Sequence, residues 1–204
     1  LDANGRVSAF ATSGGGAAWR VSTTPEGGKD HKGFGGGLAA DNGRLYAATG
    51  HGNVLALDPK TGKKIWEKNL GVPVRASPTA AGDRVFVVTF DGQTFALSGV
   101  DGNELWSFRG LPEKASLIMN ASPAVEGDTV VVPYSTGDIV ALKIANGASA
   151  WSDSLARTRS ASSLASMSDA ARPVIDGGTV FAVGHAGRMV ATAAKSGERL
   201  WSLS

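Results

Sequence analysis

The sequence predicts an all-β protein, a β-propeller of four-stranded antiparallel blades of which about four and a half are present. Three observations lead to this prediction. Each of the five tryptophans stands fourteen positions after a glycine, in the pairs Gly5 and Trp19, Gly52 and Trp66, Gly92 and Trp106, Gly137 and Trp151, and Gly187 and Trp201. Fourteen positions before four of these glycines stand Leu38, Pro78, Pro123 and Pro173. Successive tryptophans are 40 to 50 residues apart, a period typical of stacked arrays such as propellers.

Each repeat unit reads as four short strands joined by tight turns. In the unit that contains Trp106, the strands are expected at residues 76–80, 84–90, 93–97 and 104–108. Alternating, β-branched residues support the second strand. Asp91 and Gly92 are a strong hairpin signal between the second and third strands, because both residue types tolerate the positive φ of a tight turn. No stretch of useful length has helical periodicity.

The units divide the chain into a half-blade at residues 1–22 and blades at about 36–70, 74–109, 119–153 and 170–204. Each tryptophan is expected at the start of the outermost strand, where its ring covers the gap between neighbouring blades. The chain starts in the middle of a blade and without a methionine, which predicts a piece of a larger ring. Its open sheet edges predict self-association or a companion chain.

The composition is that of an ordinary globular protein. Hydrophobic residues make up 42% of the chain and charged residues 19%, with a formal net charge of +2. The near balance of acidic and basic residues argues against a nucleic-acid surface, and no apolar run reaches the roughly 18 residues of a membrane span. The absence of cysteine excludes disulfides and thiol catalysis, and it fits an oxidising compartment.

A search of the sequence for a reaction centre finds none. His31, His51 and His185 are far apart and lack the spacing of metal ligands. The glycine-rich stretch at residues 33–37 lacks the Lys-Ser/Thr pair and the helix of a phosphate-binding loop. Recurring aspartates such as Asp58 fall at turns, where capping of the backbone explains them. No catalytic, cofactor-binding or metal-binding residue is therefore expected, and the chain is expected not to be an enzyme.

The variable connections between blades are the expected functional surface, because loops on a rigid frame usually carry function. If the strands alternate in direction, these connections share one face with the hairpins that contain His51, Asp91 and His185. Two connections, at residues 110–120 and 154–172, combine apolar and charged side chains and are interpreted as a docking patch on adjacent blades. Their distinctive residues are Leu117, Ile118 and Met119 in the first, and Arg157, Arg159, Met167 and Asp169 in the second. Alternatively, residues 117–119 simply start the inner strand and pack in the core.

The repeat also resembles a known family. Residues 52–66 read Gly-Asn-Val-Leu-Ala-Leu-Asp-Pro-Lys-Thr-Gly-Lys-Lys-Ile-Trp, which is similar to the repeat of quinoprotein-like propellers. More narrowly, residues 116–123, 167–175 and 178–182 are similar to two distinctive stretches of the BamB family, lipoproteins of the machinery that assembles outer-membrane β-barrels. The resemblance covers the whole chain, but only these stretches discriminate, because the repeat itself is widely shared.

The resemblance implies an eight-bladed ring in the periplasm of a Gram-negative bacterium, anchored to the outer membrane by a lipidated N-terminus that is absent here. It implies a non-enzymatic scaffold without a cofactor, which binds the POTRA domains of the barrel-inserting subunit BamA. In the family the two loops make this contact, which carries over to Leu117 and Asp169. The sequence departs from the family pattern at Ala115, Ile118 and Ala170, which leaves the geometry of the contact open.

Two alternatives remain. A fragment of a quinone-dependent dehydrogenase would need calcium-binding carboxylates and a cofactor stack at the ring centre, and the sequence shows no such cluster. A ligand-binding or sensor propeller is the other alternative.

Overall fold

The computed structural model describes residues 1–2, 4–24, 35–110, 121–155, 171–184 and 187–203 of the chain. In these residues the regular structure consists of strands alone, arranged as one two-stranded and four four-stranded antiparallel sheets. The prediction of an all-β propeller with four-stranded blades is confirmed. A search of the same residues for helices that could span a membrane found none.

The sheets follow one another along the chain, and each is a simple meander. The half-blade contains β1 (Arg6–Phe10) and β2 (Ala17–Ser22). Blade I contains β3 (Gly36–Asp41), β4 (Arg44–Thr49), β5 (Asn53–Leu57) and β6 (Lys64–Asn69). Blade II contains β7 (Thr79–Ala81), β8 (Arg84–Val88), β9 (Gln93–Ser98) and β10 (Glu104–Arg109). Blade III contains β11 (Ala124–Glu126), β12 (Thr129–Pro133), β13 (Asp138–Lys143) and β14 (Ser149–Ser154). Blade IV contains β15 (Val174–Asp176), β16 (Thr179–Val183), β17 (Met189–Ala193) and β18 (Arg199–Leu203).

The innermost strand of blade II is shorter than the sequence suggests. In blade II the first strand was expected at residues 76–80, whereas β7 spans only Thr79–Ala81. The chain approaches it through a single bridge between Val74 and Thr89, and Pro78 then interrupts the pairing because it has no N–H to donate. Gly82 and Asp83, in the turn that follows β7, both adopt the positive φ of a tight turn.

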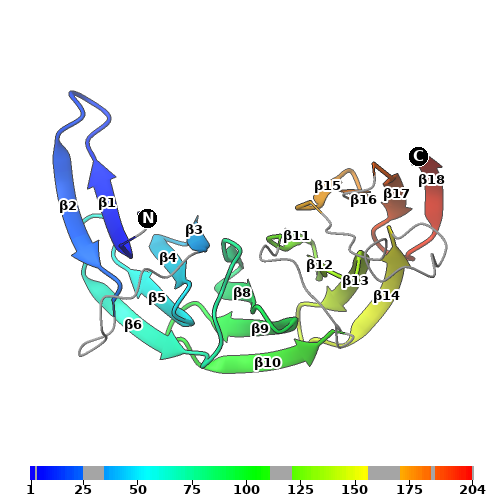
Figure 1. The fold of residues 1–204 in the computed structure, drawn as a ribbon, viewed down its shortest axis with the longest axis horizontal. Coiled ribbons are helices and arrows are strands. Elements are labelled where there is room, and N and C mark those ends of the chain that lie inside the picture. The colour runs from blue at the N-terminus through cyan, green and yellow to red at the C-terminus, as the bar shows by residue number, and fades with distance from the viewer. Residues whose placement is uncertain (3, 25–34, 111–120, 156–170, 185–186, 204) are drawn as a thin grey trace.

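The sheets stand side by side in an open arc (Figure 1). The inner strands β3, β7, β11 and β15 lie on the concave side, where neighbours in this series contact one another. The outer strands β6, β10, β14 and β18 form the convex side, and the half-blade and β18 lie at opposite ends of the arc. Because each interior sheet is covered on both faces, strands such as β5 are buried along their whole length.

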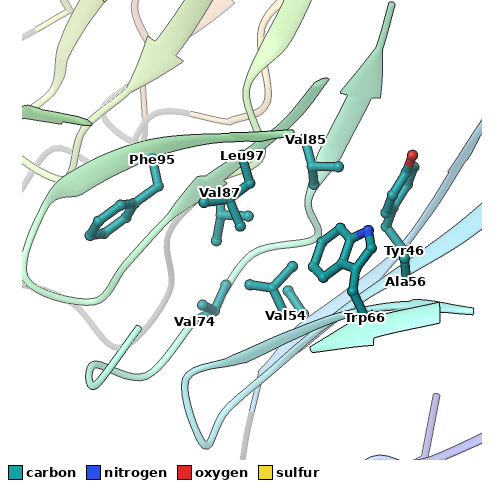
Figure 2. Close-up of a cluster of buried hydrophobic side chains, with 10 residues drawn as sticks. Tyr46, Val54, Ala56, Trp66, Val74, Val85, Val87, Phe95 and Leu97 are labelled. Atoms are coloured by element: carbon teal, nitrogen blue, oxygen red, sulfur yellow. The ribbon is translucent and has the colours of Figure 1, made fainter. Parts of the chain in front are cut away.

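The hydrophobic core is divided into layers, one between each pair of neighbouring sheets. Figure 2 shows the layer between blades I and II, where Val54 and Trp66 of blade I meet Val85 and Leu97 of blade II. These side chains alternate along their strands, so one strand supplies residues to the layers on both sides. Each layer therefore holds two sheets together by apolar burial, worth about 25 cal/mol for each Å² removed from water.

Four tryptophans join neighbouring sheets in the same way. Each lies on a glycine in the last turn of the next sheet, where an added Cβ would come within 2.5 to 2.6 Å of the tryptophan side chain; the pairs are Trp19 on Gly62, Trp66 on Gly102, Trp106 on Gly147 and Trp151 on Gly197. Each indole N–H also donates to a carbonyl three residues before that glycine; the acceptors are Pro59, Gly99, Ile144 and Ala194, at 2.7 to 2.9 Å. We call each such contact a blade joint. The prediction that the rings cover the gaps between blades is confirmed for these four tryptophans.

Candidate docking site

The residues that the sequence analysis singled out lie outside the described part of the chain. Leu117, Ile118 and Met119 belong to residues 111–120, and Arg157, Arg159, Met167 and Asp169 belong to residues 156–170. The prediction that these residues form a docking patch therefore stays a prediction. The described residues nevertheless show where on the blades both segments begin and where they end.

Both segments leave from the same face of the arc. The residue after β10 and the residue after β14 each donate a backbone N–H to the carbonyl of the glycine in the hairpin between the second and third strands of the same blade. Gly110 donates to the Gly92 carbonyl at 3.1 Å, and Leu155 donates to the Gly137 carbonyl at 2.8 Å. The expectation that blade-to-blade connections share a face with these hairpins is confirmed for both blades. We call this side of the molecule the loop face.

Gly110, the residue just before residues 111–120, packs against the ring of the buried Tyr134. A Cβ on Gly110 would lie 2.7 Å from the ring of Tyr134, so only glycine allows the chain to pass this close. The ring is buried, and its hydroxyl is 2.8 Å from the hydroxyl of Thr94 on blade II. Burial raises the pKa of Tyr134 to about 12, and the hydrogen bond with Thr94 acts in the opposite direction. Tyr134 thus stays neutral and fixes the start of the segment between blades II and III.

The return of residues 111–120 to the frame is also anchored. The hydroxyl of Thr79 on β7 donates to the Pro123 carbonyl at 2.7 Å, and both residues are buried. This bond joins the innermost strand of blade II to the chain that enters blade III. The segment therefore begins and ends at points held by buried side chains.

Residues 156–170 have an equally firm frame. Leu155, immediately before them, is fully buried in the layer between blades III and IV. Immediately after them, Ala171 donates its backbone N–H to the Val183 carbonyl at 2.9 Å. Both ends of the segment are thus attached to blades that pack directly against each other.

The loop face also carries charged and aromatic groups that the sequence analysis did not select. Arg109 Nη2 lies 2.9 Å from Gln93 Oε1 and 3.3 Å from Asp91 Oδ2. The guanidinium of Arg75 lies 5.7 Å from the ring centre of Phe90, a cation–π contact beside the same hairpin. Phe90 is 38% exposed. The sequence did offer one indication of this exposed ring, because Phe90 stands directly before the Asp91-Gly92 turn.

A cavity of about 440 Å³ lies away from this frame, between the half-blade and blade I. Its described lining combines apolar residues of β5 with the ion pair of Lys64 and Glu67, whose atoms are 2.6 Å apart. Neither residues 111–120 nor residues 156–170 are adjacent in the sequence to the residues that line this cavity. The cavity is therefore not part of the proposed docking site.

Comparison with known families agrees with the repeat and with the fold. The sequence profile of the family described as outer membrane protein assembly factor BamB matches residues 3–204. The outer membrane protein assembly factor BamB of Nitrosomonas eutropha is 29% identical over 110 residues, which make up 54% of this chain and 25% of that protein. The quinoprotein ethanol dehydrogenase of Pseudomonas putida is 42% identical over 59 residues, which make up 28% of this chain and 10% of that enzyme.

Solved structures extend the similarity to the whole chain. The crystal structure of BamB from Moraxella catarrhalis matches with a TM-score of 0.79 and 21% identity, covering 100% of this chain and 72% of that one. At this identity the likeness supports the fold alone. The aligned regions amount to 25% to 28% of the length of the first curated relatives, so the chain corresponds to part of those proteins.

Proposed function

This chain belongs to the family of the outer membrane protein assembly factor BamB, whose profile it matches over residues 3–204, and on that premise we propose that it is a non-enzymatic scaffold in the assembly of outer-membrane proteins. The partner we propose is the periplasmic POTRA domains of the barrel-inserting subunit BamA. The proposed location is the periplasmic face of the outer membrane of a Gram-negative bacterium, in an eight-bladed ring held there by a lipid anchor.

The observation that supports this proposal is that the residues just before both predicted docking segments are held in place on the loop face. Residues 111–120 and 156–170 leave from adjacent blades, and each departure point is tied by a backbone hydrogen bond to a hairpin glycine. A rigid base under two neighbouring loops limits the conformational entropy that a protein partner must remove on binding. The apolar side chains of residues 117–119 in the first segment and the charges of Arg157 and Asp169 in the second together have the composition of an interface core with a charged rim.

The test is the affinity of the chain for purified POTRA domains, measured by titration calorimetry. Leu117→Asp should weaken binding because a carboxylate would replace an apolar contact, and Asp169→Lys should weaken it by reversing a rim charge. Truncation of a central anchor commonly costs about 2 kcal/mol, which is roughly a thirtyfold loss of affinity. Thermal stability should stay unchanged if the two side chains serve docking rather than packing.

Two matched controls make the same chemical changes away from the loop face. Leu105 is an exposed residue near the start of β10, and Asp176 is the exposed last residue of β15, beside the turn to β16 at the opposite face. Leu105→Asp and Asp176→Lys should bind POTRA domains like the parent chain. If all four variants bind equally well, the loop face is not the docking site.

A dehydrogenase role is the second candidate, favoured by the 42% identity to the quinoprotein ethanol dehydrogenase. Calcium needs six to eight converging oxygen ligands, several of them carboxylates. In the described ranges, no three His, Asp or Glu side chains come together in a way that could hold a metal ion, so the residues there do not fit that cofactor site. Tight binding of both a quinone and calcium to the protein would favour this candidate over the scaffold.

A further inference from the structure

Phe90 is a large apolar side chain that the described residues leave partly uncovered. It lies on the loop face, in the hairpin that joins β8 to β9, and it is 38% exposed. It belongs to none of the four core clusters that the described residues form. Apolar side chains stabilise a fold through the surface that they remove from water, so an exposed ring contributes less than a buried one. Phe90 therefore calls for a role other than packing of the core.

The turn that contains Phe90 does not itself require an aromatic residue. In blades I and III, the residue two positions before the hairpin glycine is Gly50 or Ser135. All three turns nevertheless close with the same backbone bond, in which the glycine N–H donates to the carbonyl three residues earlier at 3.0 Å. An aromatic side chain at this position is therefore not a requirement of the repeat.

The backbone that carries Phe90 is held by hydrogen bonds. The N–H of Phe90 donates to the Pro73 carbonyl at 2.8 Å. The hydroxyl of the preceding Thr89, which is fully buried, lies 2.6 Å from Asp91 Oδ1 and 2.9 Å from the Gln93 carbonyl. The ring is therefore presented from a fixed backbone, which limits the conformational entropy lost when a partner binds.

Arg75 restrains the ring of Phe90. Its guanidinium lies 5.7 Å from the ring centre, within the distance of a cation–π contact. Arg75 directly follows Val74, which is fully buried and bridges to Thr89, so the chain that enters β7 places the cation beside the hairpin. Arg75 thus orients Phe90, and arginine and phenylalanine are both enriched in protein interfaces.

The hairpin of Phe90 adjoins the start of the first predicted docking segment. Gly92, two residues after Phe90, accepts the backbone bond from Gly110, the residue just before residues 111–120. The side chain of Arg109 is 60% exposed, and its guanidinium is hydrogen-bonded to the same hairpin. An aromatic ring beside an exposed charge has the composition of an interface anchor with its polar rim.

We propose that Phe90 is an anchor of the docking surface on the loop face, with Arg75 as the residue that positions its ring. The partner is the POTRA domains of BamA, so this role rests on the proposed function, and it adds a contact outside residues 111–120 and 156–170. A partner that binds residues 111–120 where they leave Gly110 also meets the hairpin to which Gly110 is bonded. The partner surface that fits is an apolar pocket for the ring with an acidic group at its edge, because the exposed charge beside the ring is a cation.

Titration calorimetry of the full chain with purified POTRA domains is the test. Phe90→Ala should weaken binding about tenfold or more, the loss expected for an aromatic anchor. Its melting temperature should match that of the parent, because the ring lies outside the core clusters of the described residues. Val100→Ala is the matched control and should bind like the parent. Val100 is an apolar residue, 53% exposed, in the turn between β9 and β10 at the opposite face of the same blade.

A double-mutant cycle tests the positioning role of Arg75. Arg75→Gln removes the cation and should weaken binding about two- to fivefold, the equivalent of one exposed cation–π contact. In the Phe90→Ala background the same substitution should cause no further loss, because the ring that Arg75 orients is absent. A general structural effect of Arg75 would instead persist in that background.

The possible failures can be told apart. If Leu117→Asp weakens binding while Phe90→Ala binds like the parent, Phe90 is not an anchor and the proposed function still stands. If the parent chain does not bind POTRA domains, the proposed function and the role of Phe90 both fall. Equal losses of affinity in Phe90→Ala and Val100→Ala would overturn the role of Phe90 alone. A lower melting temperature of Phe90→Ala would also overturn it, because the ring would then serve packing within the chain.

Discussion

The side chain of Trp106 rests on the backbone of Gly147, so closely that a Cβ on this glycine would lie 2.6 Å from ring atom Cε3. The contact joins β10 of blade II to the last turn of blade III, and the indole N–H adds a 2.8 Å hydrogen bond to the Ile144 carbonyl. The glycine is therefore required twice, once for its φ of 72° and once for the absence of a side chain. Both requirements can be tested separately.

Gly147→Ala should lower the free energy of unfolding by about 3 kcal/mol. Strain at a positive φ accounts for roughly 1 kcal/mol, and displacement of the Trp106 ring adds about 2 kcal/mol by overpacking. Urea denaturation followed by circular dichroism measures the difference. Gly127→Ala is the matched control, because Gly127 has a φ of 58° but an added Cβ would meet nothing within 4 Å. Equal losses in the two variants would show that the ring contact contributes nothing.

Tyr134→Phe should destabilise the protein by about 1 to 3 kcal/mol at neutral pH. The substitution keeps the ring under Gly110 but leaves the hydroxyl of Thr94, which is fully buried, without its partner. Thr94→Val should cost a similar amount, and the double variant should cost less than the two single variants together. Strict additivity in this double-mutant cycle would argue against a direct hydrogen bond.

The same tyrosine predicts a loss of stability at high pH. Its pKa is about 12 in the folded protein, whereas an ordinary tyrosine has a pKa of about 10. Between these values the unfolded chain ionises while the folded chain does not, so stability falls as pH rises above about 10. In Tyr134→Phe this loss is absent, and the stability gap between parent and variant should narrow from pH 9 to pH 11. A gap that is independent of pH would contradict the assignment.

Asp153→Asn should weaken the contact between blades III and IV. The Asp153 carboxylate accepts hydrogen bonds from Arg199 and, at 3.1 Å, from Thr192 of blade IV. Burial alone raises the pKa of Asp153, but the bonds from Arg199, the Ser154 N–H and Thr192 outweigh it and lower the pKa below its usual value. The variant should lose about 1 kcal/mol at pH 7, since Arg199 is partly exposed and water screens the pair.

The lowered pKa sets the pH range of this effect. The stabilisation is present above the ordinary aspartate pKa of about 3.9 and is lost as pH falls through the lower folded value. Asp83→Asn is the matched control, because Asp83 also pairs across two blades, with Arg44 at 3.0 Å, but its side chain is 53% exposed. That variant should change stability by less than about 0.5 kcal/mol. If Asp83→Asn costs as much as Asp153→Asn, burial does not govern the strength of these pairs.

Thr79→Val should destabilise the chain by about 1 to 3 kcal/mol, because it leaves the buried Pro123 carbonyl without the hydroxyl that now donates to it. Thr79→Ser keeps the hydroxyl and should lose less. Because the bond anchors the return of residues 111–120, Thr79→Val should also weaken POTRA binding more than Thr79→Ser does. Denaturation and titration calorimetry on the same samples measure both effects, and equal behaviour of the two variants would exclude the hydrogen bond as their cause.

Much of the fold follows from local patterns in the sequence. The recurring interval between Gly92 and Trp106 predicted the third and fourth strands of each blade, and turn residues such as Asp91 predicted the hairpins. The innermost strands were predicted less well, because the interruption at Pro78 depends on how the chain enters the blade. The exposed Phe90 and its contact with Arg75 were missed, since a cation–π pair between separate elements leaves no local pattern. The docking residues Leu117 and Asp169 stay a prediction.

The sequence by itself determined the number of strands in a blade, the places of the turns and the residue that opens each outer strand. These properties depend on interactions between residues within a few positions of one another, such as the positive φ at Gly92. Only the tertiary structure decided that Trp106 of blade II rests on Gly147 of blade III, and that Tyr134 lies under Gly110. Contacts of this kind form when separate sheets pack face to face, and no local preference of the chain specifies them.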